Sequence, residues 1–259
     1  MSANATVGIE IGLPGDDWYA SLYARQVGPD LTEAMLVCVL QEIGAAEFHV
    51  FDYRIPNKHD EIDRSISIAT KADMRFQISD AMSAIYGPFV PGTGRPEWPA
   101  TDLDRLARSG VCSACVWHEF DARINAYHHW PRPWLTEPTR PYYPLEPGLD
   151  LGASQQALSD QIAADVRPFA QRDLTVAVKH QDNTLVHLTA RAGAVPNPMI
   201  LKQAYNAVSF AIALGAAKQY GRPLWATLDM CGPDIMWSFN FPRHPGHSPI
   251  EFYNTLVLA

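Results

Sequence analysis

An apolar run near the middle of the sequence ends in two ionisable residues, His118 and Glu119, followed by Phe120. A carboxyl group between Trp117 and Phe120 is placed to lose part of its water shell, as a general acid working near neutral pH requires. The alternative is that Glu119 forms a salt bridge with an arginine such as Arg123. Glu119 is therefore the first candidate catalytic residue, and both interpretations stay open.

Other carboxylates also follow apolar runs. Asp229 ends Leu-Trp-Ala-Thr-Leu-Asp and is the second catalytic candidate; the alternative is that it caps the next turn. Asp52, beside Tyr53, is a candidate for binding a sugar hydroxyl, unless it pairs with Arg54. Carboxylates close to an apolar core are costly unless hydrogen bonds, cations or a function compensate. Two more acidic residues at such positions are interpreted as structural acceptors: Glu10 and Asp80.

Aromatic side chains are concentrated after apolar runs rather than on predicted helix faces: Trp18, Tyr86, Trp98, Tyr127, Trp130, Trp134 and Trp237. Flat rings with a polar edge suit sugars, which present CH faces and a rim of hydroxyls. The alternative is that the rings anchor long loops. The predicted substrate-binding residues are Asp52, Tyr53, Trp117, His118, Trp130 and Trp237.

The loop histidines do not have the spacing of a compact metal site: His128, His129, His244 and His247. Cys112 and Cys115 form a single CxxC without a second pair, which indicates buried thiols rather than zinc ligands. We therefore predict no metal and no cofactor.

Short apolar or β-branched runs alternate with longer segments of helical period, which is typical of a parallel sheet with intervening helices. The predicted strands are residues 6–13, 47–53, 74–80, 111–120, 174–179 and 223–229. The predicted helices are residues 31–43, 61–72, 103–109 and 154–171, then one capped by Asn197 with Pro198 at its first position, and a last one opening at Ser248. Residues 183–193 fit either a strand or a helical turn.

Six strand-helix units in 259 residues correspond to about 43 residues each, a generous spacing for a (β/α)8 barrel. A barrel with only six of its units would stay open and leave two unpaired strand edges, and the final Phe-Tyr-Asn-Thr-Leu-Val-Leu-Ala carries no helix stop. We therefore predict an α/β fold of the (β/α)8 TIM-barrel type with about six of eight units present, as one incomplete catalytic domain over residues 1–259. The alternative is a complete, open doubly wound sheet, although no glycine-rich phosphate loop follows any strand.

Composition limits the possible partners and location. The net charge of -8 argues against a protein that tracks nucleic-acid phosphates. The sequence has no apolar run long enough to span a membrane and no signal-like N-terminus, so we predict no membrane partner and a cytoplasmic location. The oligomeric state is not predicted from the sequence.

Residues 214–229, Leu-Gly-Ala-Ala-Lys-Gln-Tyr-Gly-Arg-Pro-Leu-Trp-Ala-Thr-Leu-Asp, resemble a segment of (β/α)8-barrel glycoside hydrolases and their relatives, in which a helix with this ending leads into strand six. Gly-His-Ser-Pro at residues 246–249 resembles the start of the next helix of that family. In retaining members, the acid/base is a glutamate ending strand four and the nucleophile a glutamate ending strand seven. Glu119 matches the first position, with His118 where the family usually has Asn. On the predicted strand count, the second position falls beyond the C-terminus.

The resemblance implies an O-glycosyl hydrolase in the full-length parent, with Glu119 as general acid/base and a nucleophile beyond the C-terminus. Two alternatives remain open. One is a divalent-metal-dependent sugar isomerase or epimerase that binds its ion through Glu119, Asp229 and histidines. The other is a carbohydrate-binding barrel without catalysis. A carbohydrate is the expected partner in all three cases.

Overall fold

The computed structural model describes residues 8–11, 33–42, 44–51, 58–80, 89–91, 95–121, 124, 143–200 and 206–228. The chain divides into two compact units. The first comprises Met1–Val116, Pro133–Arg140 and Pro168–Thr175, and the second comprises Trp117–Arg132, Pro141–Arg167 and Val176–Ala259. That residues 1–259 form one domain stays a prediction.

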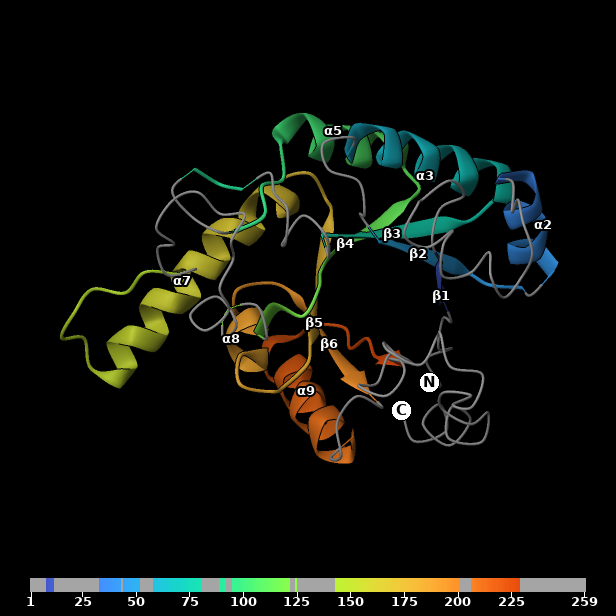
Figure 1. The fold of residues 1–259 in the computed structure, drawn as a ribbon. Helices are drawn as coiled ribbons and strands as arrows, with labels where there is room; N and C mark the ends of the chain where they lie inside the picture. Colours follow the sequence, from blue (N-terminus) through green and yellow to red (C-terminus); the bar gives the residue numbers. More distant parts are fainter. Residues whose placement is uncertain are drawn as a thin grey trace, which may run out of the picture. The chain divides into compact units, whose positions relative to one another are not determined.

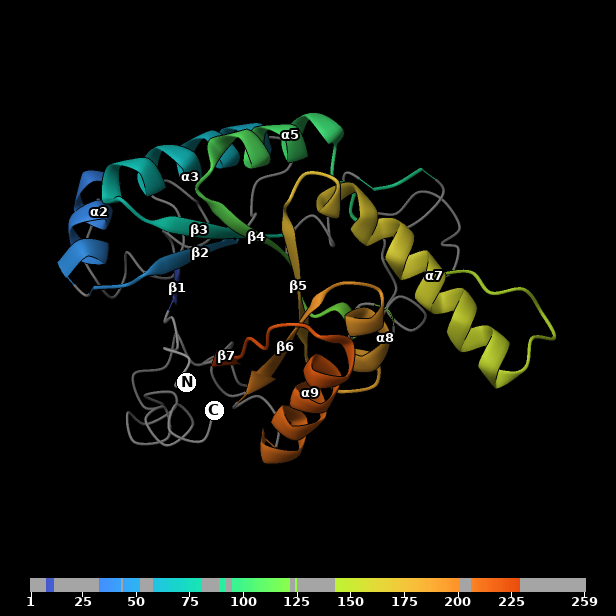
Figure 2. The same ribbon diagram turned by 180° about the vertical axis from the view of Figure 1, so that it is seen from behind.

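The first unit contains parallel strands that follow chain order: β1 (Gly8–Ile11), β2 (Glu47–Phe51), β3 (Arg75–Ser79) and β4 (Cys112–Trp117). The helices between them are α2 (Glu33–Glu42), α3 (Lys58–Ala72) and α5 (Ala100–Ser109). Both views show α3 and α5 along the same side of β3 (Figures 1 and 2). Each helix returns the chain to the start of the next parallel strand, as in any β-α-β succession.

Alternating apolar residues of the sheet form the core of the first unit. Phe48 of β2 pairs in register with Phe76 of β3, and their rings stack with centroids 5.8 Å apart. Ile78, two residues on, is also fully buried. Ile62 and Ile68 of α3 are fully buried as well. This core follows the apolar periods of two in strands and of three to four in helices.

Left-handed backbone conformations end several helices. Gly110, with φ of 67°, follows α5 and donates its N–H to the carbonyl of Ala107. Asp73, with φ of 55°, follows α3, and the next residue donates to Ala69 O at 2.9 Å. Asp173, with φ of 57°, follows α7 in the same manner. This is the usual way in which a helix satisfies its last carbonyls.

The second unit contains the parallel strands β5 (Thr175–His180), β6 (Val195–Ile200) and β7 (Thr227–Leu228), again in chain order. Helix α7 (Leu151–Ala170) precedes β5 and is capped by Asp150, whose Oδ1 accepts the N–H of Ala153 at 2.8 Å. Helices α8 (Val186–Arg191) and α9 (Asn206–Tyr220) pack on each other through small apolar side chains, beside β6 in Figure 2. These side chains are Val186, Ala190, Ala213 and Ala216.

Residues 195–200 form a strand, so the predicted helix start at Asn197 was wrong, although the later part of that helix is present as α9. Asn-Pro resembles a helix start. However, Pro196 and Pro198 are two residues apart, so the two positions without a backbone N–H lie on the same side of β6. On that side the carbonyl of Pro196 accepts the N–H of Trp225 at 3.0 Å. The other side keeps its backbone donors and pairs with β5.

The α/β class and the barrel-type order of parallel β-α units are confirmed. The predicted strand count is wrong, because β6 was missed and residues 186–191, in the ambiguous segment, form α8. The strand predicted over residues 223–229 is accordingly β7, the seventh strand of the described chain. The helix predicted from Ser248 lies outside the described residues. No helix of the described part is long and apolar enough to cross a bilayer.

Candidate active site

Glu119 follows β4 in a tight turn and adopts φ of 47°, in the left-handed region. Within the described residues, the other non-glycine residues with positive φ are Asp73 and Asp173, which end helices. Glu119 instead ends a strand. An L-residue in this region costs about 1–2 kcal/mol, and such strain persists only where the surroundings fix it. The backbone at Glu119 is therefore strained for a reason other than helix capping.

The Glu119 carboxyl lies beside the imidazole of His118. The Glu119 side chain is 27% exposed and that of His118 is 17% exposed. His118 Nε2 lies 3.7 Å from Glu119 Oε1, which is longer than a hydrogen bond. A half-buried carboxyl with an imidazole beside it, and still open to solvent, is suited to proton transfer.

The aromatic residues around Glu119 fix the turn instead of enclosing the carboxyl. The rings of Trp117 and Phe120 stack on each other with centroids 5.4 Å apart and an interplanar angle of 28°. Phe120 also contacts the ring of Tyr143, whose hydroxyl donates to Asp165 Oδ2 at 2.9 Å. Trp117 is only 6% exposed, so its ring offers little free surface. Arg123, the alternative salt-bridge partner of Glu119, lies outside the described residues.

A polar layer crosses strands β5 to β7. His180 points toward α8, where its Nε2 contacts Thr189, and because successive side chains alternate between faces, Lys179 lies on the opposite face. Lys179 pairs in register with Asn197 of β6, and Thr227 of β7 donates its hydroxyl to Asn197 Oδ1 at 2.9 Å. In barrel-type folds this face, near the C-terminal strand ends, is where ligands bind.

Sequence reasoning missed this layer. The signal was present, because Lys179 nearly ends the apolar run Thr-Val-Ala-Val-Lys-His. Lys179 is 2% exposed and Asn197 is 3% exposed, which is rare for a lysine and requires polar partners. The erroneous helix prediction hid Asn197, because it assigned that residue to a cap instead of a strand.

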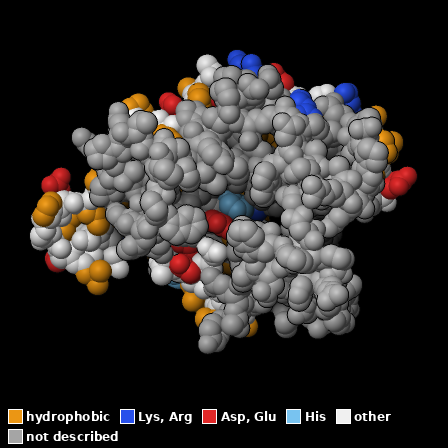
Figure 3. Space-filling view, viewed as in Figure 1, with side chains coloured by type: hydrophobic (Ala, Val, Ile, Leu, Met, Phe, Trp, Pro, Cys, Tyr) orange, Lys and Arg blue, Asp and Glu red, His pale blue; other side chains and the backbone are white. Residues whose placement is uncertain are grey.

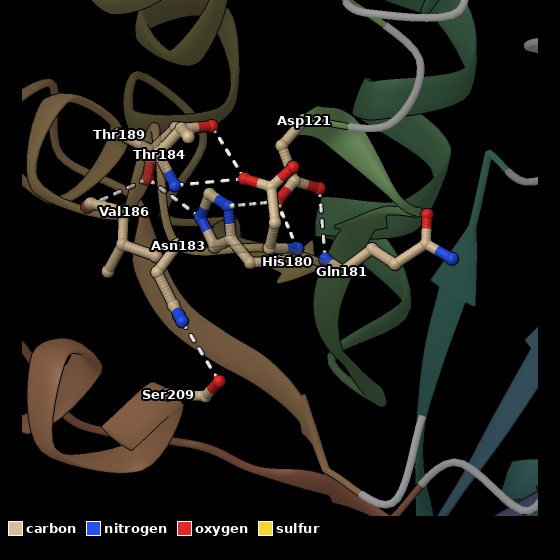
Figure 4. Close-up of polar contacts among 9 residues, drawn as sticks. Asp121, His180, Gln181, Asn183, Thr184, Val186, Thr189 and Ser209 are labelled. Atoms are coloured by element: carbon tan, nitrogen blue, oxygen red, sulfur yellow. Dashed lines mark hydrogen bonds and ion pairs between the residues drawn. The ribbon is translucent and has the colours of Figure 1, made fainter. Parts of the chain in front are cut away.

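Asp121 joins the turn after β4 to the loop after β5 (Figure 4). Its Oδ1 accepts the N–H of Gln181 at 2.9 Å and its Oδ2 accepts the N–H of Asp182 at 2.6 Å. Oδ2 also lies 3.8 Å from Nδ1 of His180, and both side chains are fully buried. On the far side of the ring, His180 Nε2 contacts Thr189 Oγ1 at 3.0 Å. Two backbone donors and one imidazole thus surround a single carboxylate.

The charges in this network follow from its hydrogen bonds. Thr189 donates its hydroxyl proton to the carbonyl of Val186 at 3.1 Å, so His180 Nε2 must donate to Thr189. Nδ1, the other ring nitrogen, faces Asp121 Oδ2 at 3.8 Å. Burial of the carboxyl raises its pKa, but His180 and the two N–H groups outweigh burial, so the pKa of Asp121 is lowered from its ordinary value of 3.8.

The structure brings three of the predicted site residues together at the end of β4: Trp117, His118 and Glu119. The remaining predicted site residues lie outside the described residues: Asp52, Tyr53, Trp130, Asp229 and Trp237. On the face drawn in Figure 3, acidic side chains and one histidine reach the surface near its middle, so ionisable groups are open to solvent there. Among the residues the structure describes, no group of three His, Cys, Asp or Glu side chains is arranged to hold a metal ion.

The sequence matches no protein-family model and no curated protein. Among solved structures, the deoxyribose phosphate aldolase from Aeropyrum pernix is similar at 14% identity and a TM-score of 0.44, over 78% of this chain and 73% of that one. The 3-keto-D-glucoside 4-epimerase from E. coli has 11% identity and a TM-score of 0.44, over 96% and 97%. The HpcH/HpaI aldolase from Desulfitobacterium hafniense has 10% identity and a TM-score of 0.44, over 91% and 82%. None of these three is described as a glycoside hydrolase, and the fold assignment rests on this chain's own strand order.

Proposed function

We propose that this chain is a carbohydrate-active barrel enzyme in which Glu119 acts as general acid/base in hydrolysis of a glycosidic bond. The observation that carries the proposal is the conformation of Glu119. A strained backbone holds a half-buried, solvent-accessible carboxyl directly after the fourth strand, beside His118. Strain of this kind is concentrated at functional sites, and barrel enzymes place catalytic groups at these strand ends.

The corrected strand count changes where the second carboxylate is sought. Glycoside hydrolysis needs a pair of carboxyl groups that flank the scissile bond. Among the described residues β7 is the seventh strand, whereas the resembling segment of that family leads into strand six. Counted by the observed strands, Asp229, the residue after Leu228 in the sequence, follows strand seven, where retaining members of that family carry the nucleophile. We therefore propose Asp229 for this role, in place of a residue beyond the C-terminus. It is an aspartate where that family has a glutamate.

The described residues divide the chemistry between them. Glu119, as a carboxylic acid, would donate its proton to the glycosidic oxygen as the bond to the sugar breaks. As that bond breaks, the Asp229 carboxylate would bond to the anomeric carbon of the sugar. Glu119, now a carboxylate, would then accept a proton from the water that attacks this carbon and releases Asp229. His118 Nε2, 3.7 Å from Glu119 Oε1, lies directly beside this acid. Lys179 and Asn197 are buried and would support the polar layer from within, and the half-buried Thr227 is the member of this layer that a sugar hydroxyl would meet.

The test is a panel of nitrophenyl α- and β-glycosides assayed with the full chain and two variants. Glu119→Gln keeps the shape of the side chain and removes its acid, and we expect kcat to fall about 100- to 10,000-fold. Glu146→Gln removes a carboxyl from an exposed residue and is the matched control, with kcat unchanged. Equal activity of Glu119→Gln and the wild type would refute the proposal.

Two further arms separate the alternatives. A metal-dependent sugar isomerase would lose activity in EDTA and regain it with Mg²⁺ or Mn²⁺, whereas a glycosidase of this design is indifferent to chelation. A carbohydrate-binding barrel would retain sugar affinity in Glu119→Gln and show no turnover in any assay. Either result would replace the hydrolase proposal.

A further inference from the structure

We infer that Asp121 is a positioning residue that holds the strained backbone of Glu119, an inference that rests on the proposed function of Glu119. Asp121 lies two residues after Glu119 and is fully buried. Its carboxylate bonds to two successive backbone N–H groups at the exit of β5. The strand end that carries the acid is therefore tied to the neighbouring loop of the same unit.

The need for such a tie follows from the backbone of Glu119. With φ of 47°, Glu119 is in a conformation that a free turn would leave for one with negative φ. A strained residue keeps its conformation only when contacts on both sides leave the chain no alternative. On one side Trp117 stacks on Phe120. On the other side the carboxylate of Asp121 fixes the chain two residues later.

The anchor of Asp121 is itself rigid. Asp182, one of the two donors, accepts the N–H of Thr184 at 2.9 Å and its hydroxyl at 2.6 Å, which orders the loop into α8. His180 lies at the end of β5, and its ring is held by Thr189 from α8. Figure 4 shows Asp121 reaching toward this loop, with His180 between it and Thr189. The carboxylate thus binds to a firmly held part of the fold.

A thermodynamic cycle tests this coupling without any enzyme assay. Glu119→Gly removes the cost of positive φ, and in the wild-type background we expect the ratio of folded to unfolded protein to rise about three-fold. In an Asp121→Asn background the turn is no longer held and Glu119 can adopt a negative φ. Glu119→Gly should therefore not raise the ratio of folded to unfolded protein there. The measurement is urea unfolding of the full chain, followed by circular dichroism.

Thr189→Val supplies the matched background. It disturbs the same buried network on the far side of His180, while Asp121 keeps both backbone donors. Glu119→Gly should still give its about three-fold gain there. If Asp121→Asn is too unstable to measure, Asp121→Ser retains one acceptor oxygen and should give an intermediate gain. The inference would be overturned if Glu119→Gly stabilised the protein by the same amount in all backgrounds: wild type, Thr189→Val, and Asp121→Asn or Asp121→Ser.

Kinetics give a second readout on any glycoside that the wild type cleaves. A displaced acid should lower kcat about ten- to one hundred-fold in Asp121→Asn while KM changes less than two-fold. Thr189→Val should keep the wild-type kcat below its unfolding temperature. Equal kcat losses in the two variants would show a general effect of stability and would contradict positioning. If no glycoside is cleaved by the wild type, the proposed function fails, while the unfolding cycle still decides the role of Asp121.

Discussion

Acidification should remove the stabilising contribution of Asp121 in a defined pH range. The pKa of Asp121 is lowered in the folded protein, so the unfolded chain binds the proton more tightly than the native state does. Stability from this group is therefore fully present above pH 3.8, the ordinary value, and is lost as the pH falls through the folded pKa. The perturbation that isolates this effect is Asp121→Asn, which removes the titrating group.

The size of the effect follows from the bonds that the carboxylate makes. Asp121 accepts two backbone N–H groups, and hydrogen bonds to a charged group contribute about 1.5–3 kcal/mol each. Asparagine can replace one acceptor oxygen but presents a donor to the second N–H. We therefore expect Asp121→Asn to lower the free energy of unfolding by about 2–3 kcal/mol at pH 7. Below pH 3.8 this difference should shrink by at most about 1.4 kcal/mol per pH unit.

The assay is urea unfolding of both proteins at a series of pH values from 7 to about 2.5, followed by tryptophan fluorescence. Subtracting the two curves cancels the other acidic residues, which the variant retains. Thr189→Val serves as a control, because its difference from the wild type should stay constant over the same acid range. A difference between wild type and Asp121→Asn that is independent of pH, or that grows on acidification, would refute the assignment of a lowered pKa.

Four further substitutions test the fold. Gly110→Ala should lower the free energy of unfolding by about 1 kcal/mol, because φ is 67° there, although the added Cβ meets open space. Gly215→Ala inside α9 should raise the free energy of unfolding by about 0.5–1 kcal/mol. Changes of the same sign for the two variants in thermal unfolding would contradict this. Tyr143→Phe removes the hydroxyl bond to Asp165 and should cost about 1 kcal/mol in urea unfolding, so an unchanged midpoint would show that the bond contributes nothing. Ile162→Ala empties a fully buried position of α7 and should cost about 2–4 kcal/mol; a loss below 1 kcal/mol would show that the site is not packed.

Periodicity predicted most of the fold because the core depends on it. The apolar stripes of α3 and of strands β2 to β5 are continuous, and each was found near its observed limits. β6 failed because its sequence Val-Pro-Asn-Pro-Met-Ile carries the local signals of a helix start. The pairing with β5 is a non-local interaction, and it shows that β6 keeps the backbone donors it needs on that side, while the positions without an N–H lie on the other side. That single error lowered the predicted strand count from seven to six.

The candidate site was predicted in part for the same reason. Glu119 was found because an apolar run ends in an ionisable pair, which is a local signal. Its positive φ, the acceptance of two N–H groups by Asp121 and the register of Lys179 with Asn197 all depend on which strands lie side by side. No pattern in one segment contains that information. Residue types therefore predicted Glu119 as a candidate acid, while tertiary structure was needed to find the contacts around it.

The role of Glu119 as the acid is tested most directly by leaving-group dependence. The measurement compares kcat/KM of wild type and Glu119→Gln on two glycosides of the same sugar, one with 2,4-dinitrophenol and one with a simple alcohol as leaving group. A general acid matters most where the departing oxygen is basic. We predict a loss of at least about 100-fold for the alkyl glycoside and less than about ten-fold for the dinitrophenyl glycoside. Equal losses for both, or none for the alkyl glycoside, would contradict the assignment.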